Sequence, residues 1–226
     1  MIRTFGRLLC TAGLIASFGS PLAQAATVID FEGEALTGLY FAGDSFVDGD
    51  YTLTARFDYG IVDVAASLGA VSPSGNATQF YFNSNDGALS LARSDGSLFD
   101  LSGFSAAFVP LDPAPLQTTV IVAVGTKQDN TTVTASWSFA SSATSHFPFS
   151  SYSGAAFAAF SNLKQVEFRA CSLVGSAICT VATQNNGQFA IDNILVAAPV
   201  PEPSTTLLLT LGLLGLGLRA RRAALR

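Results

Sequence analysis

Few side chains in this 226-residue sequence could carry out nucleophilic or zinc chemistry. The sole histidine, His146, lies among aromatic residues, and no G-x-S-x-G nucleophile motif occurs. A lone histidine in such a segment is typical of a packed or hydrogen-bonded loop residue rather than a catalytic base. Zinc is excluded because histidine and cysteine ligands are too few. The sequence therefore predicts no catalytic residue.

Paired carboxylates are the remaining route to catalysis, as in glycoside hydrolysis. Glutamate is scarce, with Glu32, Glu34 and Glu167 the only ones before Glu202, while three aspartates cluster in residues 43–50. That cluster is typical of a solvated turn. A hydrolase needs two carboxyl groups separated by about 5 to 9.5 Å, which a sequence does not reveal. A carboxylate-pair hydrolase therefore stays open as an alternative.

The amino terminus predicts export. Arg3 and Arg7 form a basic region, residues 8–18 are apolar, and Ala23-Gln24-Ala25 is a cleavage site of the A-x-A type. We expect a signal peptide over residues 1–25, recognised by the secretion translocon and cleaved between Ala25 and Ala26. In the oxidising compartment outside, Cys171 and Cys179 should form a disulfide that closes a nine-residue loop. A redox or metal site would need closer spacing or histidine partners.

The exported body is acidic. Six of the 11 basic residues lie in the terminal segments, whereas all 16 acidic residues lie between Asp30 and Glu202, which leaves a charge near −11. Nucleic-acid binding is excluded because it needs a cationic surface. The body has no run of 18 apolar residues, and its length suits one core.

Residues 26–197 have the pattern of a β-sandwich. Short β-branched and aromatic runs are separated by Gly, Asn, Asp and Ser, and helical periodicity is absent apart from one turn at 155–160. The runs predict strands at 27–32, 51–57, 78–82, 88–93, 104–109, 118–125, 131–139, 166–170 and 189–196. Turn residues at 83–87 and 127–130 predict hairpins between the strands that they join. We expect an all-β, antiparallel two-sheet sandwich of the jelly-roll type, with Trp137 facing the core.

The last segment, residues 198–226, combines a chain breaker, an apolar run and a basic end. Proline keeps the breaker extended, and about 14 residues over 204–218 suit a short transmembrane helix of roughly 21 Å. A basic tail over 219–226 would hold that helix with its end in the cytoplasm. The breaker consists of Val200, Pro201, Glu202, Pro203 and Ser204, and the membrane-flanking basic residues are Arg219, Arg221 and Arg222.

This order of segments resembles the PEP-CTERM sorting signal, which implies processing by the membrane protease-transpeptidase exosortase. An ordinary C-terminal anchor is the alternative. The body, through residues 30–32, 76–83, 99–104, 118–125 and 187–194, is similar to a group of PEP-CTERM proteins that has no assigned molecular function.

The opening Asp-Phe-Glu and the closing Phe-Ala-Ile-Asp-Asn-Ile also resemble the terminal strands of galactose-binding-like jelly rolls. That resemblance implies a structural calcium held by Glu32 and Asp192, since these strands often share one. The alternative is that Asp192 and Asn193 only form hydrogen bonds at a strand edge.

Together these features predict an exported protein that is anchored in the inner membrane by its C-terminal helix. After processing by exosortase it would reach the cell surface or extracellular matrix. There we expect a non-enzymatic structural, adhesive or glycan-binding role with exopolysaccharide as partner. The sequence does not identify the glycan-binding residues.

Overall fold

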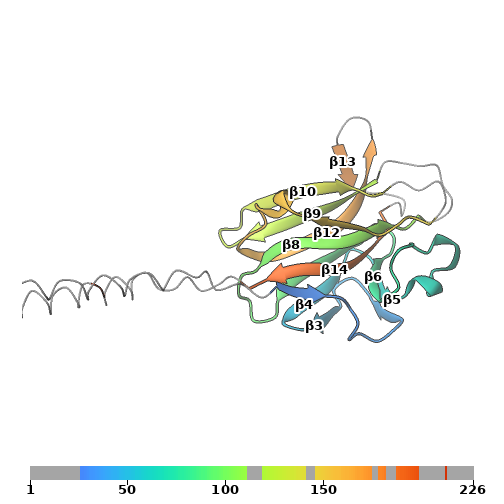
Figure 1. The fold of residues 1–226 in the computed structure, drawn as a ribbon, viewed down its shortest axis with the longest axis horizontal. Coiled ribbons are helices and arrows are strands. Elements are labelled where there is room, and N and C mark those ends of the chain that lie inside the picture. The colour runs from blue at the N-terminus through green and yellow to red at the C-terminus, as the bar shows by residue number, and fades with distance from the viewer. Residues whose placement is uncertain are drawn as a thin grey trace, which may run out of the picture. The chain divides into compact units, whose positions relative to one another are not determined.

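The body folds into two antiparallel sheets of seven strands each (Figure 1). The computed structural model describes residues 26–110, 119–140, 146–174, 178–181, 187–198 and 212, without the side chains of 172–181. All of these except 212 belong to one compact unit, Ala25–Pro199. The all-β, two-sheet sandwich expected from the sequence is confirmed.

We call the first sheet sheet A. Its edge strands are β11 and β2, and β1 pairs with residues 194–197 of β14. The strand order is β11 (Ser150–Ser153), β8 (Asp100–Phe108), β14 (Phe189–Ala197), β6 (Phe80–Asn83), β5 (Gly60–Asp63) and β2 (Gly38–Tyr40), with β1 (Ala26–Ile29) on β14.

The second sheet, sheet B, has the long strand β12 near its centre. The order is β10 (Thr132–Ser138), β9 (Thr119–Lys127), β12 (Leu163–Val174), β7 (Ala88–Arg93), β4 (Tyr51–Arg56) and β3 (Ser45–Asp48), with β13 (Ile178–Val181) on β12. Sheets A and B thus end in the edge strands β2 and β3.

The main core lies between the sheets and follows the alternation of the strands. In β4, Tyr51, Leu53 and Ala55 are buried while the residues between them are partly exposed. Phe104 lies at the centre of an aromatic cluster, with its ring 5.2 Å from those of Trp137, Tyr152 and Phe168. Trp137 packs against the core, as predicted.

One predicted hairpin is confirmed and the other is wrong. Strands β9 and β10 pair antiparallel across the 127–130 turn, where Asn130 has a positive φ of 66°. Strand β6, by contrast, belongs to sheet A and β7 to sheet B, so the 83–87 turn carries the chain from one sheet to the other. Both strands are buried on both faces, so turn residues alone did not define their partners.

A 3-10 turn and the β12–β13 hairpin also bear on the predictions. Residues Ala155–Phe157 form a single 3-10 turn, in the predicted place. In the β12–β13 hairpin Cys171 lies opposite Val181, and Cys179 lies opposite Leu173. Since the side chain of Cys179 is outside the described ones, the Cys171–Cys179 disulfide stays a prediction.

Both targeting segments lie outside the described residues, apart from Gly212. The signal peptide with its Ala25–Ala26 cleavage point and the apolar helix over 204–218 therefore stay predictions. Within the described residues, no helix combines the length and apolarity that a membrane crossing requires.

Candidate functional site

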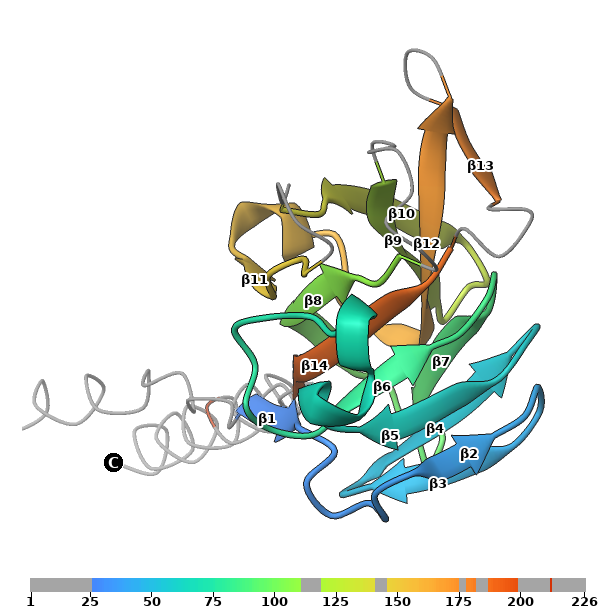
Figure 2. The ribbon, with the colours of Figure 1, turned by 90° about the vertical axis from the view of Figure 1, so that its right-hand side faces the viewer.

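The outer faces of the two sheets differ, and the outer face of sheet A is covered over β6 and β14. Phe80, Phe82 and Ala190 point outward and are buried under the segment between β5 and β6, to which Leu68 and Val71 belong. Figure 2 shows the short helical turns of this segment in front of β6 and β14. His146 contacts this covering segment, since its Nδ1 lies 2.8 Å from the carbonyl oxygen of Ser72. This contact agrees with the predicted role of His146 as a hydrogen-bonded loop residue.

Asp192 lies under the same cover, next to a bulge in β14. The pairing of β14 with β8 shifts after Asp192, where Asn193 has a positive φ of 50°. The Asp192 carboxylate is fully buried and accepts four hydrogen bonds. They come from the amide nitrogen of Asn76 (2.7 Å), the hydroxyl of Thr78 (3.2 Å), and the backbone and side-chain nitrogens of Asn193 (2.6 and 2.9 Å).

Burial raises the pKa of Asp192 to about 6 despite these hydrogen bonds, which lower it. The negative charge of Asp30 raises the pKa further. A perturbed carboxyl group is often catalytic. Here the carboxylate is closed off from solvent and its oxygens are occupied by protein donors, so the arrangement serves the packing of residues 76–78 onto β14.

Glu32 reaches the other end of the same segment. Its Oε1 accepts a 2.7 Å hydrogen bond from the backbone nitrogen of Gln79. With the Gln79 amide turned so that its nitrogen faces them, it donates to the carbonyl oxygens of Phe31 (3.1 Å) and Glu34 (3.2 Å). Residues 76–79 therefore connect the two predicted calcium ligands, although no group of three His, Cys, Asp or Glu suited to a metal occurs among the described residues.

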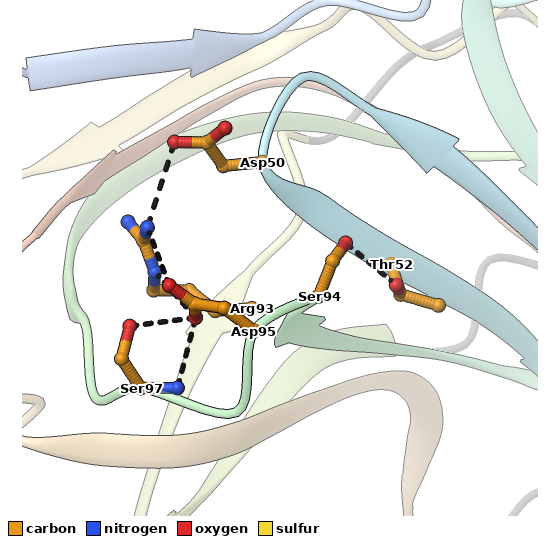
Figure 3. Close-up of polar contacts among 6 residues, drawn as sticks. All are labelled: Asp50, Thr52, Arg93, Ser94, Asp95 and Ser97. Atoms are coloured by element: carbon orange, nitrogen blue, oxygen red, sulfur yellow. Dashed lines mark hydrogen bonds and ion pairs between the residues drawn. The ribbon is translucent and has the colours of Figure 1, made fainter.

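The aspartates of residues 43–50 do not act as one site. Asp44 accepts a hydrogen bond from the backbone nitrogen of Phe41, and Asp48 accepts one from that of Phe31. Asp50 lies 3.5 Å from Arg93, at the β3–β4 turn. Figure 3 shows Arg93 between Asp50 and Asp95, and Asp95 accepts two bonds from Ser97. These carboxylates hold turns together.

The outer face of sheet B is polar and partly exposed on β4 and β12, whereas Ala88 and Ser90 on β7 and Val122 on β9 are buried. We define the open face by its outward residues on the neighbouring strands β4, β7 and β12, whose inward neighbours fill the core. It carries Thr52, Thr54, Arg56, Ser90, Gln165, Glu167 and Arg169. The register places Thr54, Ser90 and Glu167 in one row across the sheet, and Arg56, Ala88 and Arg169 in the next.

Glu167 and Arg169 form the central charged pair of the open face. Their side chains are 18% and 35% exposed, and their charged atoms lie 4.0 Å apart. At one end of β4, Arg56 lies over the ring of Phe57, with 5.7 Å between the guanidinium carbon and the ring centroid. A shallow polar pocket of about 340 Å³ lies at the opposite end of the sheet, lined by Lys127, Gln128, Asp129, Ser161 and Asn162.

Sequence reasoning missed the residues of the open face. Alternation along β12 gives a signal for Glu167 and Arg169, because Val166, Phe168 and Ala170 are buried between and beside them. The alignment of Arg56 with Arg169 has no such signal in the sequence. It depends on the pairing of β4 with β7 and of β7 with β12. The predicted sorting residues, from Val200 to Arg222, lie outside the described residues.

One solved structure supports the fold. A DUF4465 family protein from Bacteroides caccae superposes with a TM-score of 0.53 at 12% identity, over 78% of this chain and all of that chain. A family 11 carbohydrate-binding module from Clostridium thermocellum, in complex with a mixed-linked tetrasaccharide, gives a TM-score of 0.35 at 12% identity. That match covers 78% of this chain and 96% of the module.

No curated protein sequence matches the chain. The model of the PEP-CTERM protein-sorting motif matches residues 199–222, which include the breaker, the apolar run and three of the terminal arginines. The chain thus carries a C-terminal PEP-CTERM motif behind a β-sandwich body similar to a DUF4465 protein, which implies export and exosortase-mediated sorting to the cell surface.

Proposed function

We propose that the body is a non-enzymatic glycan-binding module that attaches to exopolysaccharide through its open face. The observation that carries the proposal is the difference between the two outer faces. Over β6 and β14 the outer face of sheet A is sealed by apolar residues, and its exposed end on β8 carries uncharged groups such as Ser102, whereas the open face carries the partly exposed charged pair Glu167 and Arg169. A protein sorted to the cell surface meets polysaccharide there, and the open face presents charged and polar side chains on paired strands.

The chemistry of the open face suits a polyhydroxylated ligand. The hydroxyls of Thr52 and Thr54, the amide of Gln165 and the charged pair offer both donors and acceptors. Hydrogen bonds to charged groups contribute about 1.5 to 3 kcal/mol each, roughly twice a neutral one. A sugar chain lying across the strands would meet these groups row by row.

The hydrolase alternative has less support on this face. Its three described strands carry one outward carboxylate, Glu167, whereas glycoside hydrolysis needs a pair. The neighbour of Glu167 is a guanidinium 4.0 Å away rather than a second carboxylate. Binding without turnover is therefore the function that we propose.

The proposal also includes the topology of the fold, a disulfide and the membrane anchor. We infer a galactose-binding-like jelly roll, a disulfide between Cys171 and Cys179, and a transmembrane helix over 204–218 that anchors the exported protein until exosortase acts. Release then places the body at the cell surface or in the matrix, where exopolysaccharide is its partner.

A structural calcium beside Glu32 belongs to the same proposal. The carbonyl oxygens of Phe31 and Glu34 converge on the Gln79 amide, which donates to them without an ion and would turn its oxygen toward a bound one. Phe31 has a φ of 61°, which few bulky residues adopt. Calcium prefers such carbonyl, amide and carboxylate oxygens. Glu32 would supply the charge, and Asp192 would hold residues 76–79 in place or contribute an oxygen itself. The ion would join the first strand to the segment that covers β14.

The binding proposal is tested by affinity electrophoresis of the mature protein in gels that contain the exopolysaccharide of the producing cells. We expect retardation of the wild type and about tenfold weaker binding for Glu167→Gln, because one charged hydrogen-bonding group is lost. Ser102→Ala, a change on the outer side of β8 in sheet A, is the matched control and should bind like the wild type. Release of reducing ends that Glu167→Gln abolishes would indicate the hydrolase instead.

A further inference from the structure

Phe57, at the end of β4, combines backbone strain with exposure. Its φ is 69°, a conformation that costs a bulky residue roughly 1 to 2 kcal/mol and that glycine adopts freely. Its side chain is 67% exposed, the largest fraction among the large apolar side chains that the structure describes. Folding alone would favour a small or polar residue here, so the phenylalanine has another use.

The turn around Phe57 is held firmly. The backbone nitrogen of Asp58 donates to the carbonyl oxygen of Arg56 (2.9 Å), and the Asp58 carboxylate accepts from Asn85 (2.9 Å) and from the backbone nitrogen of Tyr59 (2.9 Å). The ring is therefore presented to solvent by a fixed backbone. A fixed aromatic surface binds a ligand with little loss of conformational entropy.

Arg56 makes this end of the open face cationic. Its guanidinium carbon lies 5.7 Å from the Phe57 ring centroid, and no carboxylate of the described residues lies within ion-pair distance of it. Arg93, which also contacts an aromatic ring, differs because Asp50 and Asp95 surround it. Arg56 thus keeps its donors for a ligand.

A second guanidinium lies in the same row. Arg56 is opposite Ala88, and Ala88 is opposite Arg169, so two strand spacings of about 4.8 Å separate the two arginine backbones. In a body with a charge near −11, Arg56 and Arg169 place two guanidinium groups at one end of the open face, although Glu167, 4.0 Å from Arg169, offsets part of their charge. A ligand that binds there is expected to be anionic.

We propose that Arg56, Phe57 and Arg169 form a subsite for an acidic sugar, with the pyranose ring stacked on Phe57 and its carboxylate bound by the two arginines. This subsite rests on the proposed glycan binding and names the class of glycan, a polymer that contains uronic acid. The aromatic ring provides the apolar contact, and the guanidinium groups bind a carboxylate in the geometry that arginine favours.

The test compares polygalacturonate, an acidic polymer, with dextran, a neutral one, using the mature protein in affinity electrophoresis. We expect binding to polygalacturonate that weakens as salt is added, and much weaker binding to dextran. Phe57→Ala and Arg56→Ala should each reduce the affinity about tenfold, whereas Phe57→Tyr should retain it. Leu36→Ala, which removes another exposed apolar side chain, and Lys164→Ala, which removes another cation, are the controls.

Phe57→Asn separates binding from folding. Asparagine tolerates a positive φ, so this variant should melt at a higher temperature than the wild type and still lose binding about tenfold. Wild-type affinity in both Phe57→Ala and Phe57→Asn, or equal affinity for dextran and polygalacturonate, would overturn the subsite. If those variants bind normally while Glu167→Gln is weakened, glycan binding stands and the acidic-sugar subsite fails. A wild-type protein that binds no polysaccharide would remove both.

Discussion

At the scale of single residues, Gly60 shows how closely β5 approaches the core. A Cβ atom at Gly60 would collide with the hydroxyl and ring of Tyr81, which is fully buried in β6. The Tyr81 hydroxyl is buried without a hydrogen-bond partner. The close approach therefore keeps the tyrosine in place although its hydroxyl contributes no bond.

We expect Gly60→Ala to lower the free energy of unfolding by about 1 to 3 kcal/mol, because a packed core relaxes poorly around added atoms. Tyr81→Phe should be neutral or stabilising, since it removes an unsatisfied polar group. The double variant should recover part of the loss. Urea unfolding of the four proteins measures these values, and simple additivity in the double variant would contradict the contact.

Asp192 predicts a dependence of stability on pH. Its pKa is about 6 in the folded protein against an ordinary value of 3.8, so between these pH values the folded state binds more protons than the unfolded state. Stability from this group is present below about pH 4 and is lost as the pH rises through 6. The change amounts to about 3 kcal/mol at most.

The measurement is urea unfolding from pH 4 to 7 in a chelator, for wild type and Asp192→Asn. The wild type should lose stability relative to the variant as the pH rises. Asp129→Asn is the control, because hydrogen bonds from Thr131 lower the pKa of Asp129, so its pH dependence lies below about pH 4 and its difference from the wild type should stay constant over this range. A constant difference between wild type and Asp192→Asn would show that the buried carboxyl keeps its ordinary pKa.

At the scale of elements, the segment 76–79 connects the first strand to the last. Its residues contact both Glu32 and Asp192, which are 160 positions apart in the sequence. If calcium binds beside Glu32, adding millimolar calcium to chelated protein should raise the melting temperature by several degrees, as expected for a ligand of the native state alone. Glu32→Gln should lose this shift.

Glu167→Gln is the matched control for calcium, because it removes a carboxylate from the opposite sheet and should keep the shift. An Asp192→Asn protein that retains the shift would limit Asp192 to holding the segment. The absence of any calcium-dependent shift in the wild type would remove the site.

Most strands could be predicted from the sequence, but their pairing could be predicted only in part. β7 has its predicted bounds, Ala88–Arg93, because a β-branched or aliphatic run between two turns needs no distant information. The short strands β2, β3, β5, β11 and β13 were not predicted, since each has only three or four residues. Strand pairing also decides the site, because it alone brings Arg56 into line with Arg169.

At the scale of the whole molecule, sorting to the cell surface and the proposed glycan binding depend on different parts of the chain. The sorting motif covers residues 199–222, while the open face belongs to the compact unit Ala25–Pro199. The arginines of the motif are lost with the tail if exosortase cleaves it. The released body would then keep its acidic charge, and the arginines of the open face would be a large part of its cationic surface.

Cleavage is tested by intact-mass analysis of the protein from the envelope of strains with and without exosortase. Cleavage near Pro201–Ser204 should lower the mass by roughly a tenth of the 23.4 kDa chain in the strain that has the enzyme, and not in the other. A Pro201→Ala, Pro203→Ala variant should keep its tail in both strains, because the extended breaker is lost. Phe57→Ala, which changes the body alone, should be cleaved like the wild type. An intact C-terminus in both strains would mean that the tail acts as a permanent anchor, with the open face held at the membrane.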